Sequence, residues 1–185
     1  MKKTLFAVIA ALTMTAIFAK SNDSMEYLKI EGKVVMGVKD PEKVPAHIVI
    51  PNGIVEISNG AFERCTFLEN ITIPGSVKVI GYCTFLSCKS LKSVTILDGV
   101  ETIVGASFLD CTSLTSITIP VSVKEIGWAL DGGSAFTGCE SLTEVNYGGT
   151  RKQWTEIDGK ERVARDSGRV TVHCKDGDYI QKYNN

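Results

Sequence analysis

The segment Ile71–Leu91, ITIPGSVKVIGYCTFLSCKSL, is followed 23 residues later by the similar segment Val94–Leu114, VTILDGVETIVGASFLDCTSL. Both begin with an apolar–polar–apolar triplet, and both carry a phenylalanine, a cysteine and a leucine at the same spacing. The aromatic–cysteine–leucine triplet occurs four times, as Phe62/Cys65/Leu68, Phe85/Cys88/Leu91, Phe108/Cys111/Leu114 and Phe136/Cys139/Leu142. A constant period of this length indicates a solenoid, in which each repeat forms one coil that stacks on the next.

Four repeats can be written from this pattern, the last of them with an insertion of five residues. Their bounds are 46–68, 69–91, 92–114 and 115–142. The alternation in Ile71-Thr72-Ile73 predicts a strand whose isoleucines point inward. Val77–Ile80 predicts a second, short extended piece, and the three-residue spacing of the phenylalanine, cysteine and leucine predicts a short helical or 3₁₀ arc.

The repeat resembles that of the BspA-like leucine-rich repeat proteins, which follow I-x-I-P-x-x-V-x-x-I-G-x-x-A-F-x-x-C-x-x-L. Departures are Thr84 and Ser107 at the alanine position and Leu97 at the proline position. The resemblance implies a β-rich, α/β-type solenoid: a right-handed stack of coils with one parallel sheet. It also implies an N-terminal hairpin cap at 28–40, within a linker and cap region 20–45, and a last strand and C-terminal cap at 143–185.

The N-terminal segment differs from the repeats. Lys2 and Lys3 precede an apolar run from Leu5 to Ala19, and a polar stretch follows. By its charge, length and flanks this arrangement predicts a secretory signal peptide at 1–19 with cleavage near Ala19, and the run is short for a membrane span; the alternative is an uncleaved anchor. We therefore expect a secreted, periplasmic or cell-surface protein with no stable membrane span after cleavage.

Composition and charge narrow the classes of function. The net charge of −1 gives no basic footprint for nucleic acid. The two histidines fall near opposite ends of the repeats, and no cysteine or histidine pairs have zinc-site spacing. We therefore predict no catalytic residues, no metal and no cofactor. The column Cys65, Cys88, Cys111 and Cys139 is expected to be reduced and to pack as small apolar residues, whereas Cys83 and Cys174 fall outside it.

The outward positions of the predicted strands form a small, hydroxylated and nearly uncharged face. The candidate binding residues there are Asn70, Thr72, Ser93, Thr95, Ser116, Thr118, Glu144 and Asn146. Trp128, next to the insertion of repeat four, is a further candidate because aromatic residues are enriched at binding hot spots. The plain alternative is that Thr and Ser are simply good solvent-facing strand residues, and that Trp128 covers the edge of its coil.

Two functions remain open from the sequence. The first is an exported binding or adhesion module with a protein ligand, which the resemblance implies is an extracellular-matrix or host surface protein. The second is a structural or interaction protein inside the cell envelope, with no host ligand. The ligand itself and the oligomeric state are not specified by the residues.

Overall fold

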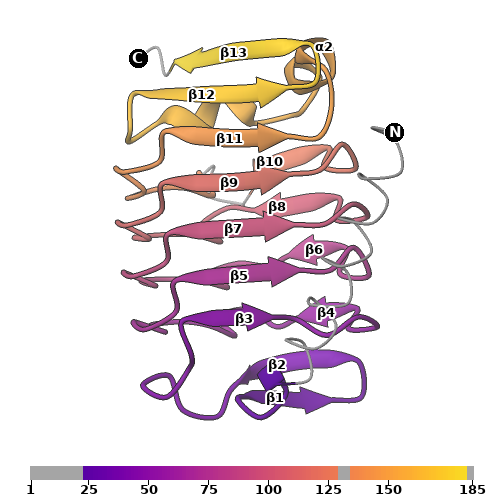
Figure 1. Cartoon of the computed structure of the whole chain (residues 1–185), viewed down its shortest axis with the longest axis vertical. Coiled ribbons are helices and arrows are strands. Elements are labelled where there is room, and N and C mark those ends of the chain that lie inside the picture. The colour runs from indigo at the N-terminus through magenta and orange to yellow at the C-terminus, as the bar shows by residue number, and fades with distance from the viewer. Residues whose placement is uncertain (1–22, 129–133, 183–185) are drawn as a thin grey trace, which may run out of the picture.

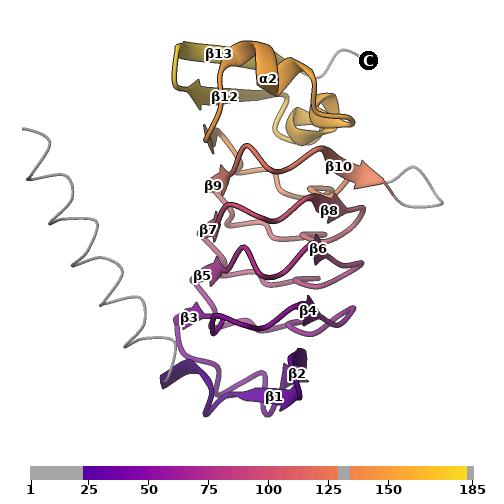
Figure 2. The ribbon, with the colours of Figure 1, turned by 90° about the vertical axis from the view of Figure 1, so that its right-hand side faces the viewer.

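The structure is a computed structural model that describes residues 23–128 and 134–182. The predicted signal peptide at 1–19 lies outside these residues. The described chain winds into coils stacked along one axis, and each coil contributes one strand to each of two sheets (Figures 1 and 2). The predicted β-rich solenoid is confirmed.

The larger sheet runs the length of the stack. Its strands are β3 (His47–Val49), β5 (Asn70–Ile73), β7 (Ser93–Ile96), β9 (Ser116–Ile119), β11 (Glu144–Tyr147), β12 (Arg169–Cys174) and β13 (Gly177–Lys182). Neighbours from β3 to β12 pair in parallel, and β13 closes the sheet in antiparallel fashion. Equivalent residues of neighbouring repeats lie opposite one another: Ile71 is opposite Val94, and Val94 is opposite Ile117. Inward residues therefore stack on inward residues throughout.

A second sheet lies on the other side of the coils, where the sequence predicted only a short extended piece in each coil. It contains β1 (Leu28–Glu31), β2 (Val34–Val38), β4 (Glu56–Ile57), β6 (Val79–Ile80), β8 (Thr102–Val104) and β10 (Glu125–Trp128). The expectation of one parallel sheet is thus corrected to two. The antiparallel hairpin β1–β2 covers the first coil, and β2 then pairs in parallel with β4.

The core consists of columns in which each side chain meets its equivalent in the next coil. Four buried phenylalanines stack with ring centroids 5.3, 5.1 and 5.3 Å apart in successive pairs: Phe62, Phe85, Phe108 and Phe136. Stacked aromatic pairs add about 0.5–1.5 kcal/mol each beyond their buried area. The ladder is therefore a strong link between coils.

The cysteine column lies beside this ladder, and its four thiols are free and buried, as predicted. Cys88 Sγ donates to the Phe62 carbonyl at 3.0 Å, and Cys111 Sγ donates to the Phe85 carbonyl at 3.1 Å. Hydrogen bonding with the Cys65 thiol, together with burial, raises the pKa of Cys88. The Cys88 thiol is consequently held in its protonated, unreactive form.

The phenylalanine segments are turns, so the predicted helical or 3₁₀ arc is wrong. Two positions recur with left-handed backbone in these turns, the first in three of them and the second in all four, with φ between 54° and 75°. They are Gly60, Cys83 and Ala106 at the first position, and Arg64, Ser87, Asp110 and Gly138 at the second. Backbone N–H groups here bond to the next coil, as Phe85 does to the Ser107 carbonyl at 2.8 Å. The repeated turns are thus stabilised by stacking rather than by helical hydrogen bonds.

The C-terminal cap covers the last coil with helix α2 (Arg151–Thr155) and the 3₁₀ helix η1 (Lys160–Ala164). Thr150 and Gln153 form a capping box at the start of α2. Trp154 is completely buried, packs edge-on against Tyr147 with centroids 5.3 Å apart, and donates from Nε1 to Gln181 at 3.4 Å. The indole ring of Trp154 thus forms part of the apolar surface that covers the last coil.

Replacing Trp154 by alanine should lower the free energy of unfolding by about 3–5 kcal/mol, because a large buried aromatic is lost and a cavity remains. Urea unfolding followed by circular dichroism measures the change. Lys152→Ala, on the exposed side of the same helix, is the control and should alter stability by less than about 0.5 kcal/mol. A similarly small effect of Trp154→Ala would contradict the capping role.

Replacing Ala106 by glycine should stabilise the protein by about 1 kcal/mol, because alanine at φ 59° is strained and glycine is not. Ala135→Gly, in the next turn but outside the left-handed positions, should destabilise it instead. Thermal unfolding of both variants checks the prediction, and a loss of stability in Ala106→Gly would refute it.

Candidate binding face

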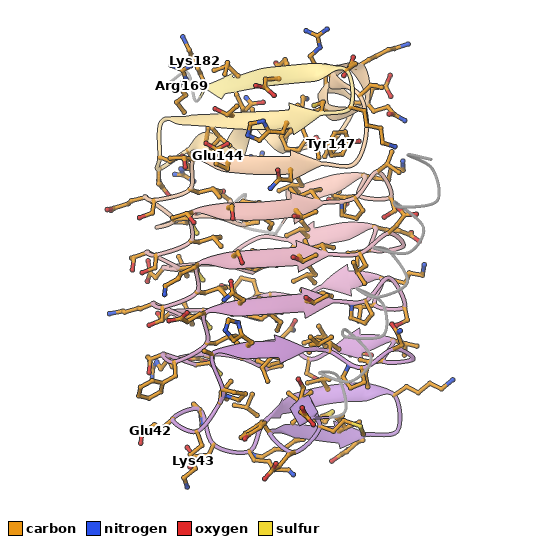
Figure 3. The ribbon with its side chains drawn as sticks, viewed as in Figure 1. Glu42, Lys43, Glu144, Tyr147, Arg169 and Lys182 are labelled. Atoms are coloured by element: carbon orange, nitrogen blue, oxygen red, sulfur yellow. The ribbon has the colours of Figure 1, made fainter. Side chains whose placement is uncertain are left out.

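The outward side chains of the larger sheet form two rows that cross its strands. The first row consists of His47, Asn70, Ser93, Ser116, Glu144 and Thr171. The second row consists of Val49, Thr72, Thr95, Thr118, Asn146 and His173. The strand register thus brings together all the predicted face residues except Trp128. Glu144, labelled in Figure 3, marks the C-terminal part of this face.

Trp128 does not belong to these rows. It is the last residue of β10, and its backbone pairs with Val104 in the second sheet. That sheet lies across the coil from the two rows (Figure 2). The Trp128 side chain and the neighbouring residues 129–133 lie outside the described part of the chain.

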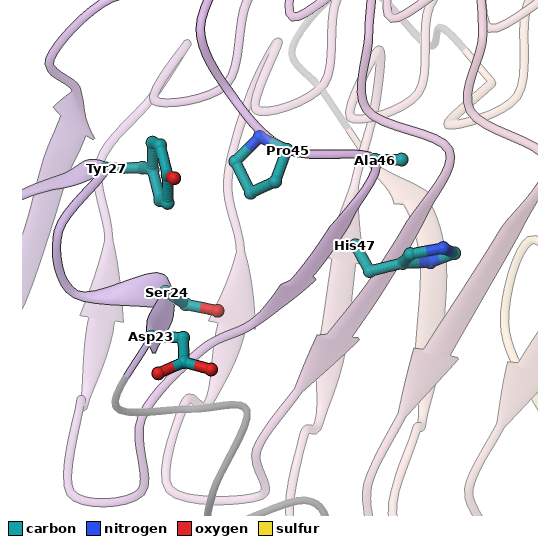
Figure 4. A pocket seen from close by; sticks show the side chains of 6 residues that line it. All are labelled: Asp23, Ser24, Tyr27, Pro45, Ala46 and His47. Carbon is teal, nitrogen blue, oxygen red and sulfur yellow. The ribbon is translucent and has the colours of Figure 1, made fainter.

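At the N-terminal end, polar side chains of the face bond to one another. His47 Nδ1 lies 3.0 Å from Asn70 Nδ2, and Ser93 Oγ donates to Asn70 Oδ1. A recess of about 260 Å³ opens beside His47 (Figure 4). It is lined by Asp23, Ser24, Tyr27, Pro45, Ala46 and His47. Its wall is mainly apolar, and its ionisable side chains are Asp23, Tyr27 and His47.

The C-terminal end of the face holds an ionic cluster that the sequence reasoning missed. His173 Nε2 lies 2.5 Å from Glu144 Oε2, and His173 Nδ1 lies 2.9 Å from Asp178 Oδ1. The hydrogen bond with Glu144, followed by that with Asp178, raises the pKa of His173. The alternation of Val170 and Val172 with Thr171 and His173 was the available signal, because it puts the latter two on the outward side of a strand.

The middle of the face differs from both ends. Thr72, Thr95, Ser116 and Thr118 are half-buried. Within residues 23–128 and 134–182, these four hydroxyls form no side-chain hydrogen bond to other protein groups. They belong to the adjacent strands β5, β7 and β9. The centre can therefore donate and accept hydrogen bonds without breaking any within the protein, and we define it as the central hydroxyl patch.

The two histidines of the face lie far apart in the described part of the chain. Four strands separate His47 on β3 from His173 on β12. In the described part of the chain, no three His, Cys, Asp or Glu residues are grouped so as to hold a metal ion. The same residues contain no helix that is long and apolar enough to cross a membrane.

These features define a leucine-rich repeat solenoid with one regular polar face. The family model for the BspA type leucine rich repeat region (6 copies) matches residues 45–157, more than half of the chain. The protein belongs to this family, as its repeat pattern predicted. No curated protein matches the sequence.

Two solved structures of bacterial proteins are similar to this chain. A leucine rich cell surface protein of Faecalibacterium prausnitzii is 28% identical, with a TM-score of 0.51 over 68% of this chain and 38% of that one. A leucine-rich repeat protein of Bacteroides ovatus is 31% identical, with a TM-score of 0.41 over 61% and 34%. The present chain thus spans little more than a third of either relative.

The ionic cluster should make stability depend on pH through His173. A folded-state pKa above the unfolded value of about 6.5 means that protonation stabilises the fold. The contribution of His173 is then fully present below about pH 6.5 and is lost as pH rises through the folded pKa. Unfolding curves of the wild type and His173→Gln should differ most between about pH 5 and 6.5, where His173 is protonated and the carboxylates of Glu144 and Asp178 are still ionised, and should converge at high pH.

NMR titration of the His173 ring provides the matched control. Glu144→Gln removes the nearer carboxylate and should lower the pKa of His173, whereas Glu140→Gln, on the exposed turn before β11, should leave it unchanged. Equal effects of the two substitutions would contradict the role of the Glu144 contact.

Proposed function

We propose that the protein is an exported binding module that uses the central hydroxyl patch to hold a protein ligand. The observation that carries this proposal is the contrast between the ends and the centre of the face. The histidine at each end of the face is engaged with a neighbouring polar side chain, whereas the central hydroxyls have no such partner among the described residues. A ligand can satisfy them at little cost, because it displaces only water.

Membership of the family and the likeness to a cell surface protein support an interaction role outside the cell. The predicted signal peptide at 1–19 supports export in the same direction. For the ligand we propose an extracellular-matrix or host surface protein. Several copies displayed together would raise the effective affinity of a face that lacks large aromatic anchors.

The size and charge of the residues in the central hydroxyl patch also limit which surfaces of a ligand can contact it. Its residues are small, and none of the four carries a charge, so an approaching backbone can come close to the strands. Such a backbone offers both N–H and C=O groups to the threonine hydroxyls. We propose that the ligand presents an extended or loop segment rather than a strongly charged surface.

Replacing Thr95 and Thr118 together by arginine should abolish binding to whichever matrix or serum protein the wild type binds saturably. The long charged side chains would cover the patch and hold a ligand away from the strands. The wild type and the variant are compared by surface plasmon resonance against an immobilised panel of such proteins, with a loss of at least about tenfold in affinity expected.

A matched control is available on the second sheet. Val79 and Thr102 are opposite each other on β6 and β8, and both side chains are accessible there. Val79→Arg with Thr102→Arg adds the same charge to neighbouring coils and should leave binding intact. Loss of binding in both double variants would disprove the assignment to this face.

Failure of the folded wild type to bind any member of the panel would instead favour the role inside the cell envelope. Protease treatment of intact cells then distinguishes the two sites of action. Cleavage of the protein in intact cells supports display outside, and protection until the envelope is opened supports the internal role.

A further inference from the structure

The last strand of the larger sheet, β13, has an unpaired outer edge. It ends the strand order of the sheet, and within residues 23–128 and 134–182 no other strand pairs with that edge. Unpaired strand edges are templates for pairing with another chain, and proteins that remain monomeric commonly block them. The residues along this edge decide which partner it suits.

The hydrogen-bond pattern shows which backbone groups point outward. The N–H of Thr171 donates to the Thr143 carbonyl, so the backbone of Thr171 faces the coil below it. Thr171 is opposite Ile180 in the antiparallel β12–β13 pair. Because directly opposed residues alternate between bonded and non-bonded pairs, the backbone groups of Asp178, Ile180 and Lys182 point to the free edge.

The side chains of the same three residues lie on the outward face of the sheet, and Ile180 is 39% exposed. Their inward neighbours, Tyr179 and Gln181, pack toward the cap. The edge thus presents an aspartate, an isoleucine and a lysine at alternate positions, with the apolar residue in the centre.

Charge is divided between the two ends of this edge. Arg169 is opposite Lys182, and both lie at one end of the hairpin (Figure 3). Within the described residues no carboxylate forms an ion pair with either cation. Asp178 lies at the other end, 60% exposed although it also contacts His173. The edge therefore has a positive end and a negative end.

We infer that two copies of the chain pair through β13, antiparallel about a two-fold axis at Ile180. In this register Ile180 meets its own equivalent, and Asp178 of each copy meets Lys182 of the other. The N–H and C=O groups of all three residues then bond across the axis. The Lys182 carbonyl accepts from Gln181 Nε2 at 3.2 Å, but a carbonyl has a second lone pair for this bond.

A second copy fits this edge because the sequence is self-complementary. A two-fold interface requires that a residue and its partner exchange roles, and the Asp178–Lys182 pairing does so on both sides of the axis. Each lysine, now beside an uncompensated arginine, gains a carboxylate. Opposite charges across antiparallel strands are favourable and like charges are unfavourable.

The test uses protein that is expressed from the full sequence and purified in the form that the cell produces. Sedimentation velocity over a range of concentrations should give the mass of two chains at high concentration. Lys182→Glu places carboxylates opposite Asp178 at both ends and should weaken association by at least about tenfold. Asp178→Lys combined with Lys182→Glu exchanges the charges and should restore it.

Lys175→Glu, in the exposed turn between β12 and β13, is the matched control and should leave association unchanged. Circular dichroism checks that each variant is folded. A wild type that stays monomeric at about 100 μM would overturn the inference, as would equal effects of Lys182→Glu and Lys175→Glu. If the wild type dimerises but the double variant Asp178→Lys with Lys182→Glu does not recover association, this register of the two strands is wrong.

Discussion

The structure depends on in-register hydrogen bonding between successive coils. Each residue lies one strand spacing, about 4.8 Å, from its equivalent in the next coil, so the side chain at every position must tolerate a copy of itself as neighbour. Inside, this requires columns of matching size, as in the phenylalanine ladder. Outside, like charges at equivalent positions of neighbouring coils would repel each other. The charged positions therefore alternate in sign from one coil to the next: Lys92 pairs with Glu69 at 2.8 Å, and Lys78 pairs with Glu101 at 3.5 Å. The central hydroxyl patch satisfies the same constraint without charge.

This constraint explains which features could be predicted from the sequence. The 23-residue period fixed the coils, and alternation around Thr72, Thr95 and Thr118 fixed the inward and outward sides of the larger sheet. The second sheet was missed because strands such as β4 and β6 are two residues long, too short for alternation, and are created by stacking. The three-residue spacing of Phe85, Cys88 and Leu91 suggested a helix, but consecutive turns hold the same side chains inward. The position of Trp128 could not be predicted, because it depends on the pairing of β10 with β8 in the second sheet, which the local sequence does not specify.

The departures from the repeat pattern are tolerated for identifiable reasons. Thr84 and Ser107 place hydroxyls in the core, where unpaired polar groups are costly. Both donate to the Gly81 carbonyl, at 2.8 and 2.9 Å, so neither is left unsatisfied. Cys83 and Ala106 occupy left-handed positions where the first repeat has Gly60. The strain is maintained because the stacked turns on both sides impose the same backbone path, a case of tertiary structure overriding local preference.

The same geometry limits what one copy of the face can do. The central hydroxyl patch spans three strands, or about 10 Å across the sheet, and about 7 Å along them. The resulting area of about 70 Å² is far below the roughly 800 Å² that each partner buries in a standard interface. A ligand must therefore extend over the polar ends, where it competes with the His47–Asn70 and His173–Glu144 contacts, or engage several copies at once. Pairing through β13 would join two such faces in one continuous sheet at a fixed separation. The second contact would then be intramolecular, and modest individual affinities would combine without any new type of interaction.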